Sequence, residues 1–111
     1  MNISQILNIK PLSVNGCWQG KRFKTKEYIN YEKVVLMMLK KDFIEDAPYK
    51  LNIEYGFSNN ASDIDNPTKP FLDILQKKYK INDKDIVELH LYKKKVKKGQ
   101  EYIKFSLTTI N

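Results

Sequence analysis

The chain has 111 residues and a formal charge of +7, from 20 lysine and arginine residues against 13 acidic ones. That length allows one domain, residues 1–111, and the 41% hydrophobic content excludes a wholly disordered chain. A single cysteine, Cys17, excludes an intrachain disulfide framework and a cysteine-rich zinc site. No apolar run approaches the roughly 20 residues that span a bilayer, and no signal-peptide core stands at the N-terminus. We therefore expect a soluble, cytoplasmic protein with no membrane partner.

Hydrophobic periodicity predicts the elements of the first half. Residues 5–9 form a short strand, and residues 10–25 form a loop that contains Pro11, two glycines and several cations. Thr25 caps a helix that runs to residue 41 or 43, because its apolar positions recur at helical spacing. Residues 49–57 alternate as a strand and lead into a polar loop.

The second half adds one helix and two strands. Asp65 or Asn66 caps the helix, with Pro67 near its first turn, and the helix ends near residue 79. Residues 85–95 alternate as a strand, residues 97–100 form a hairpin turn, and residues 101–108 return as the last strand. The order β-α-β-α-β-β predicts an α+β fold, in which two helices pack on a mixed four-stranded sheet.

Positive charge is concentrated at both ends of the chain. Residues 1–26 have a net charge of +5 and residues 77–111 of +6, whereas residues 27–76 have −4. Such ends favour a nucleic-acid partner, because cations that neutralise phosphates release counterions; the alternative is a solvated lysine surface. All the cations except Arg22 are lysines, which contact phosphate and read base edges poorly. The candidate phosphate contacts are Lys21, Arg22, Lys24, Lys93, Lys94, Lys95, Lys97 and Lys98.

Three aspartates form a candidate metal site. Asp63 and Asp65 are separated by one residue, so in extended backbone both side chains point the same way. Asp83 follows the predicted helix, and we expect the chain to fold back and bring it to this pair. Three such carboxylates repel one another unless a cation such as Mg²⁺ lies between them. The alternative for Asp65 is a plain helix N-cap.

Lys69 lies four residues after Asp65 and four before Asp73. Helical spacing places these side chains on one face, where we expect Asp73 to hold the lysine. Beside a metal, the ammonium group would stabilise charge on a scissile phosphate. The alternative is an ordinary intrahelical ion pair, which contributes about 0.3–0.5 kcal/mol.

Residues 63–75 (DIDNPTKPFLDIL), followed by residues 82–87 (NDKDIV), resemble the RusA family of Holliday-junction resolvases. The family pattern is Asp-x-Asp-Asn-x-x-Lys, then an apolar helix with an internal aspartate, then a short acidic turn before a strand. Pro11, Ser13 and Asn15, with the basic aromatic loop after them, are similar to the family's N-terminal segment. Where the family has an arginine run before the first aspartate, residues 59–62 here are Asn, Asn, Ala and Ser.

The resemblance implies a homodimeric, Mg²⁺-dependent endonuclease that resolves four-way DNA junctions, with Mn²⁺ as an alternative metal and no small-molecule cofactor. Asp63, Asp65 and Asp83 fall on the family's catalytic, metal-binding positions, and Lys69 falls on its catalytic lysine. A two-fold dimer would supply two identical sites for the paired nicks.

Three other interpretations remain open. A non-catalytic basic nucleic-acid-binding module explains the charge but gives the aspartates no role. A metal-dependent nuclease of broader scope would also cut flaps and other branched DNA. A small homomeric structural protein would show no salt-dependent DNA binding.

Overall fold

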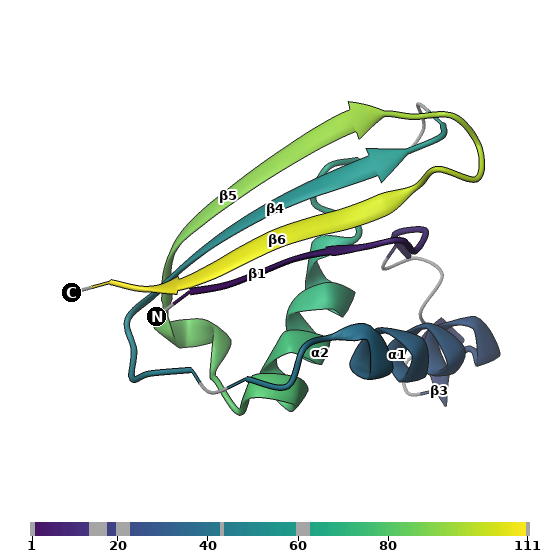
Figure 1. Ribbon diagram of the computed structural model, residues 1–111. Coiled ribbons are helices and arrows are strands. Elements are labelled where there is room, and N and C mark those ends of the chain that lie inside the picture. Colours follow the sequence, from purple (N-terminus) through teal and green to yellow (C-terminus); the bar gives the residue numbers. More distant parts are fainter. Residues whose placement is uncertain (1, 14–17, 20–22, 43, 60–62, 111) are drawn as a thin grey trace.

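The computed structural model describes residues 2–13, 18–19, 23–42, 44–59 and 63–110. Its helices and strands follow the predicted order, with a short β2–β3 ribbon and the 3₁₀ helix η2 in addition (Figure 1). In chain order the elements are β1 (Asn2–Leu7), β2 (Trp18–Gln19), β3 (Phe23–Lys24), α1 (Lys26–Met38), β4 (Tyr49–Phe57), α2 (Thr68–Tyr79), η2 (Asp83–Asp85), β5 (Ile86–Lys95) and β6 (Tyr102–Thr109). Among the described residues, no helix is long and apolar enough to cross a membrane.

Four strands form one sheet in the order β1-β6-β4-β5. β6 pairs antiparallel with both β1 and β4, whereas β4 and β5 run parallel. Figure 1 shows α1 and α2 on the same side of this sheet, so the molecule has two layers. The predicted α+β fold, with two helices on a mixed four-stranded sheet, is confirmed.

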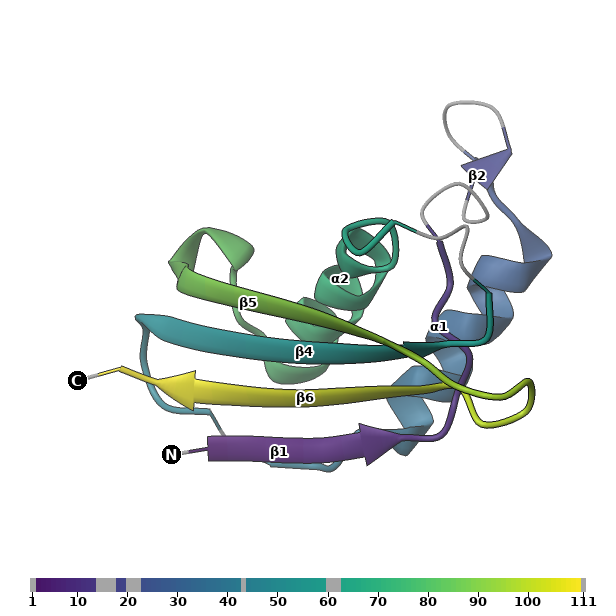
Figure 2. The ribbon, with the colours of Figure 1, turned by 90° about the horizontal axis from the view of Figure 1, so that it is seen from above.

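The predicted hairpin at residues 97–100 is wrong, because β5 and β6 do not pair and β4 lies between them. The chain does turn there, and it passes round the end of β4 to reach β6 (Figure 2). The reason is that α2 is a crossover connection, which returns β5 to the sheet parallel to β4. β6 then takes the other edge of β4, where Ile103, Phe105 and Leu107 are buried.

The core lies between the sheet and the two helices. Alternate side chains of the central strands β4 and β6 face the helices, and each helix turns its apolar side towards them. On α2, Phe71 packs edge-on against Phe105 of β6, with ring centroids 5.4 Å apart. The largest fully buried side chains are Tyr28, Tyr55, Phe71, Phe105, Ile3, Leu7, Leu51, Ile53, Ile74, Leu75, Ile103 and Leu107.

Thr25 caps α1 as predicted, and its hydroxyl oxygen accepts the N–H of Tyr28 at 3.0 Å. The helix ends at Met38, earlier than predicted, because the chain becomes extended at the next residue. Gln5 of β1 then satisfies the helix end: its amide donates to the carbonyl of Met38 at 2.6 Å and accepts the N–H of Lys40 at 3.0 Å. A contact from a distant strand thus ends the helix, which local periodicity does not reveal.

The predicted side-chain cap of α2 by Asp65 or Asn66 is wrong. The helix begins at Thr68, and its N-cap residue Pro67 makes no side-chain cap bond. The segment before it is a turn, in which the backbone carbonyl of Asp65 accepts the N–H of Thr68 at 3.0 Å. Thr68 itself is buried, with its hydroxyl 2.9 Å from the hydroxyl of Tyr55. This contact fixes the start of α2 against β4 and leaves the Asp65 side chain without a capping role.

Gly56 of β4 lies where no side chain fits, because a Cβ atom would overlap the ring of Tyr102 on β6. The hydroxyl of Tyr102 donates to the carboxylate of Glu54, which holds the ring in place.

We expect Gly56→Ala to lower the free energy of unfolding by about 1–3 kcal/mol, as overpacking does, and urea denaturation measures this change. In a Tyr102→Ser background, Gly56→Ala should lower the free energy of unfolding by clearly less. An equal loss in both backgrounds would show that overlap with the Tyr102 ring is not the cause.

Candidate active site

The predicted catalytic residues lie on the crossover that connects β4 to β5. Asp63 and Asp65 belong to the segment that leads into α2, Lys69 lies in the first turn of α2, and Asp83 begins η2. All four side chains are exposed. Because they share one connection, the packing of α2 on the sheet sets the positions of all four.

Lys69 lies between two carboxylates. Its Nζ is 3.0 Å from Oδ1 of Asp73, one turn further along α2, and 3.8 Å from Oδ2 of Asp83. The predicted contact between Lys69 and Asp73 is confirmed. The hydrogen bond and charge of Asp73 raise the pKa of Lys69, partial burial opposes the rise, and the charge of Asp83 adds to it. Lys69 is therefore fully protonated at neutral pH.

Gln76 connects η2 to α2. Its side-chain oxygen accepts the backbone N–H of Asp83 at 3.1 Å, and its amide nitrogen donates to Oδ1 of Asp73 at 3.4 Å. These contacts hold Asp83 beside Lys69, and we call Lys69, Asp73, Gln76 and Asp83 the Lys69 cluster. Gln76 was not among the residues predicted from the sequence, although its position three residues after Asp73 places it on the same helical face.

The structure does not bring the three predicted metal-binding carboxylates into one group. Among the described residues, which include Asp63, Asp65 and Asp83, no three His, Cys, Asp or Glu side chains are arranged to hold a metal ion. Asp83 is held at the turn of α2 that contains Gln76, whereas Asp63 and Asp65 precede the first turn. The cation that meets Asp83 is the ammonium group of Lys69.

Asp63 and Asp65 have the character of Mg²⁺ ligands. Both are exposed, and neither forms an ion pair with another described residue. Mg²⁺ is usually bound by one or two carboxylates together with waters and substrate phosphates, not by an all-protein cage. Two exposed carboxylates are donors of the kind that a hydrated Mg²⁺ ion accepts, but the segment is a turn, in which the carbonyl of Asp63 accepts the N–H of Asn66 at 3.2 Å, and not the extended backbone assumed for the pair. Asp83 belongs to the Lys69 cluster.

The N-terminal cations predicted to bind phosphate are only partly described. Lys21 and Arg22 lie outside the described residues. Lys24 of β3 is paired within the protein: its Nζ is 3.3 Å from Oε2 of Glu32 and 5.1 Å from the ring centroid of Tyr28. Its charge is therefore offset by an acidic group of α1.

Lys93, Lys94 and Lys95, which we call the β5 lysines, end an edge strand of the sheet, and all three are exposed. Because side chains alternate along a strand, Lys93 and Lys95 stand on the helix side of the sheet and Lys94 on the open side. Lys93 Nζ is 5.9 Å from the ring centroid of Phe57, and Lys94 Nζ is 3.7 Å from Oε1 of Glu54. The β5 lysines thus lie at the end of the sheet from which β4 leads towards Asp63 and Asp65.

Glu32 of α1 joins three elements. Its Oε1 is 2.9 Å from Nζ of Lys77 on α2, and its Oε2 is 3.3 Å from Nζ of Lys24 on β3. Partial burial raises the pKa of Glu32, but the hydrogen bonds and charges of Lys77 and Lys24 outweigh that effect and lower it. This network could not be predicted from the sequence, because the two lysines belong to other elements and no local spacing connects them to Glu32.

Comparison with models of known protein families and with curated proteins gives no match to this chain. The resemblance to the RusA family therefore stays a prediction, carried by residues 63–75 and 82–87 of the sequence.

We expect Glu32→Gln to lower the free energy of unfolding by about 1 kcal/mol at pH 7, because its two lysine partners are themselves substantially exposed. A lowered pKa means that the charged pair stabilises the fold at high pH. The difference from wild type should therefore disappear as the pH falls below the ordinary value of 4.5 and through the folded-state pKa.

Urea denaturation between pH 7 and pH 3 measures this dependence. Glu27→Gln is the matched control, since Glu27 lies on the same helix, is exposed and forms no ion pair with another described residue. A destabilisation by Glu32→Gln that stays constant down to pH 3 would show that charge is not its cause.

Proposed function

We propose that this protein is a metal-dependent endonuclease that cuts branched DNA, with the four-way junction as its main substrate. The observation that carries the proposal is the Lys69 cluster, in which a protonated lysine is held between Asp73 and Asp83 in the first turns of the helix that follows the exposed Asp63 and Asp65 in the chain. A fixed cation favours hydrolysis of a phosphodiester, since negative charge builds up on the phosphate oxygens in the transition state.

Asp63 and Asp65 would hold a Mg²⁺ or Mn²⁺ ion. When bound, such an ion polarises a phosphoryl oxygen and lowers the pKa of a bound water. Lys69 would place its positive charge at the phosphate and stabilise the charge that develops there. Asp73 and Asp83 orient Lys69 and keep it protonated, so in this proposal Asp83 acts through the lysine and does not hold the ion.

Resolution of a four-way junction needs two nicks related by two-fold symmetry. A homodimer would present two copies of the site in that relation. The β5 lysines would contact the phosphates that approach the same end of the sheet, and the lysine-rich composition favours recognition of backbone and shape over base sequence.

A non-catalytic basic module that binds nucleic acid is the second candidate. It is favoured by one observation, that Asp63, Asp65 and Asp83 do not form one metal-binding group among the described residues. The two proposals differ in a single property, because only the nuclease cuts DNA when Mg²⁺ is added.

A synthetic four-way junction tests the proposal. We expect paired nicks with Mg²⁺ and none with EDTA, and we expect a flap or a linear duplex to be cut more slowly. Asp65→Asn should cut the junction about 100-fold more slowly than wild type, with unchanged junction affinity. Asp46→Asn, an exposed acid in the segment before β4, is the control. Wild-type cleavage by Asp65→Asn, or binding without any metal-dependent cleavage, would overturn the proposal.

The β5 lysines have their own test. Reversal of all three charges to glutamate should weaken junction binding, and it should reduce the slope of log affinity against log salt by about 1 for each phosphate that the protein no longer neutralises. Fluorescence anisotropy over a series of salt concentrations measures both quantities. The control is the same reversal on the exposed lysines Lys33, Lys40 and Lys41. Equal effects in the two triple variants would mean that β5 contributes only net charge.

A further inference from the structure

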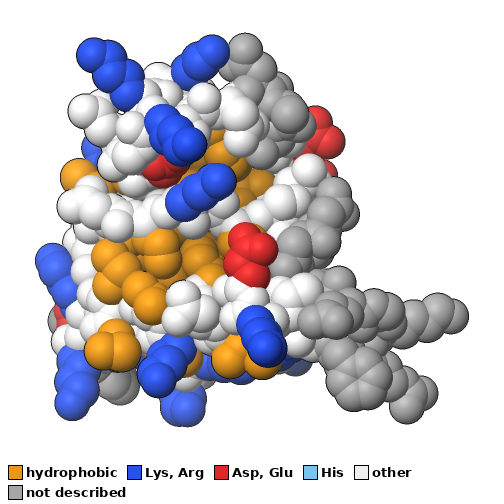
Figure 3. Space-filling view, turned by 90° about the vertical axis from the view of Figure 1, so that its right-hand side faces the viewer, with side chains coloured by type: hydrophobic (Ala, Val, Ile, Leu, Met, Phe, Trp, Pro, Cys, Tyr) orange, Lys and Arg blue, Asp and Glu red, His pale blue; other side chains and the backbone are white. Residues whose placement is uncertain are grey.

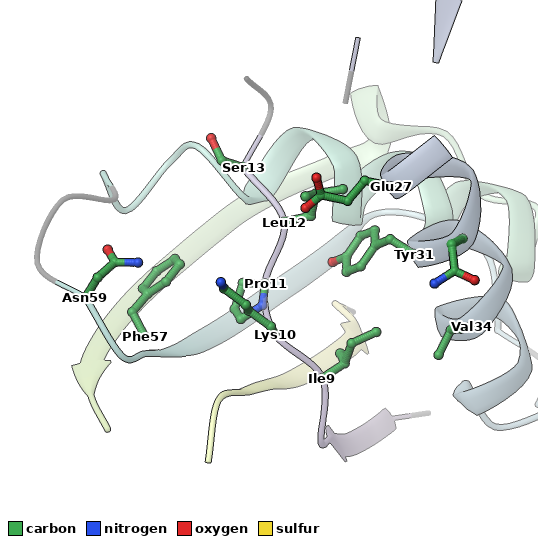
Figure 4. Close-up of a pocket in the computed structure, with 11 residues that line it drawn as sticks. Ile9, Lys10, Pro11, Leu12, Ser13, Glu27, Tyr31, Val34, Phe57 and Asn59 are labelled. Carbon is green, nitrogen blue, oxygen red and sulfur yellow. The ribbon is translucent and has the colours of Figure 1, made fainter. Parts of the chain in front are cut away.

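A groove of about 390 Å³ lies between the chain that follows β1, the part of α1 from Glu27 to Val34 and the end of β4. Its apolar wall is formed by Pro11, Leu12, Tyr31, Val34 and Phe57. Figure 4 shows the segment after β1, α1 and the end of β4 around the groove. Tyr31 and Val34 project from α1, and Phe57 lies opposite them on β4. The groove is thus assembled from three parts of the chain that are remote in sequence.

Polar groups stand at the edges of this groove. Lys10 lies on the segment after β1, Asn59 lies two residues beyond Phe57, and Asn30 and Glu27 lie on α1. In Figure 4, Asn59 and Glu27 are on opposite sides, with Lys10 between them. The side-chain amides of Asn30 and Asn59 can form hydrogen bonds with the edge of a planar ring. A bound anion would be repelled by the carboxylate of Glu27, so its place in the groove would be at Lys10.

The face on which the groove opens combines apolar and basic character. Figure 3 shows hydrophobic side chains gathered in the middle of this face, with lysine side chains above and below them and an acidic side chain at the edge of the patch. The β5 lysines adjoin it, since Lys93 lies over Phe57, which lines the groove. An apolar slot within a basic surface suits a ligand with a flat apolar body and a phosphate, and it does not suit a neutral apolar peptide.

We propose that this groove receives one unpaired nucleotide of a DNA strand, with its base between Pro11, Val34 and Phe57 and its phosphate at Lys10. This inference rests on the proposed function, because it assumes a DNA partner. A base stacked within a continuous duplex cannot enter, so the groove would select DNA in which pairing is interrupted. Asn59, which lines the groove, precedes Asp63 by four residues in the sequence.

The test compares three duplexes of one sequence: fully paired, with one bulged adenine, and with a bulged abasic site in place of that adenine. We expect wild-type protein to bind the adenine bulge about tenfold more tightly than either of the others, as measured by fluorescence anisotropy. The abasic bulge keeps the interruption of the backbone and removes the base, so it separates base recognition from recognition of a kink. Equal affinity for the two bulges would overturn the inference.

Asn30→Phe should fill the groove and abolish the preference for the adenine bulge. Asn30 is exposed on α1, so the substitution is compatible with the fold, and circular dichroism checks this. Met37→Phe is the matched control, because Met37 is 77% exposed on the same helix and does not line the groove. An intact preference in Asn30→Phe would overturn the inference.

Lys10→Ala is a second variant that leaves the helices untouched. It should weaken binding of the adenine bulge more than binding of the paired duplex, whereas Lys104→Ala, on the open face of the sheet, should affect both equally. Junction cleavage is measured separately. Cleavage without any preference for the bulged base refutes the groove alone, and a base preference without cleavage refutes the nuclease alone.

Discussion

The pairing of β4 along both edges is the constraint on which the rest of the structure depends. A parallel neighbour cannot be reached by a tight turn, so the chain must travel back along the strand before β5 can begin. Residues 58–85 make that return, with α2 as their middle part. Every residue of the candidate active site lies on this return. The burial of Phe71, Ile74 and Leu75 on α2 therefore decides where the site is, as much as it stabilises the core.

The Lys69 cluster contributes little to that stability. Its lysine is 61% exposed and its two carboxylates are 31% and 44% exposed, so water screens the attraction between them. The effect of the cluster is electrostatic and local, because it keeps one positive charge at a fixed place between Asp73 and Asp83.

Much of the fold could be predicted because its signals are local. Thr25 predicts the start of α1, and the alternation of apolar and polar residues predicts β4. The apolar face of α2 follows from Phe71, Ile74 and Leu75. The errors occur where distant parts of the chain meet. Strand neighbours depend on the crossover and not on the turn at residues 97–100, and the end of α1 depends on Gln5. Local patterns carry no information about such contacts.

The site shows the same division. The contact of Lys69 with Asp73 follows from helical spacing and is confirmed, whereas the meeting of Asp83 with Asp63 and Asp65 required a fold-back that spacing alone could not specify. The chain does fold back, but the side chain of Gln76, part-way along α2, accepts the backbone N–H of Asp83 and holds Asp83 against Lys69. The groove beside Phe57 has no sequence signature at all, since its walls come from three separate segments.

The outer strand β5 has a polarity of its own. It follows Asp83 and Asp85, carries Glu88 near its beginning, and ends in three consecutive lysines. A polyanion that approached this edge would be attracted at the lysine end and repelled at the acidic end, so it would contact the edge at the lysine end and not lie along the strand. The charge gradient along β5 would thereby restrict a negatively charged partner to the lysine end of this sheet edge.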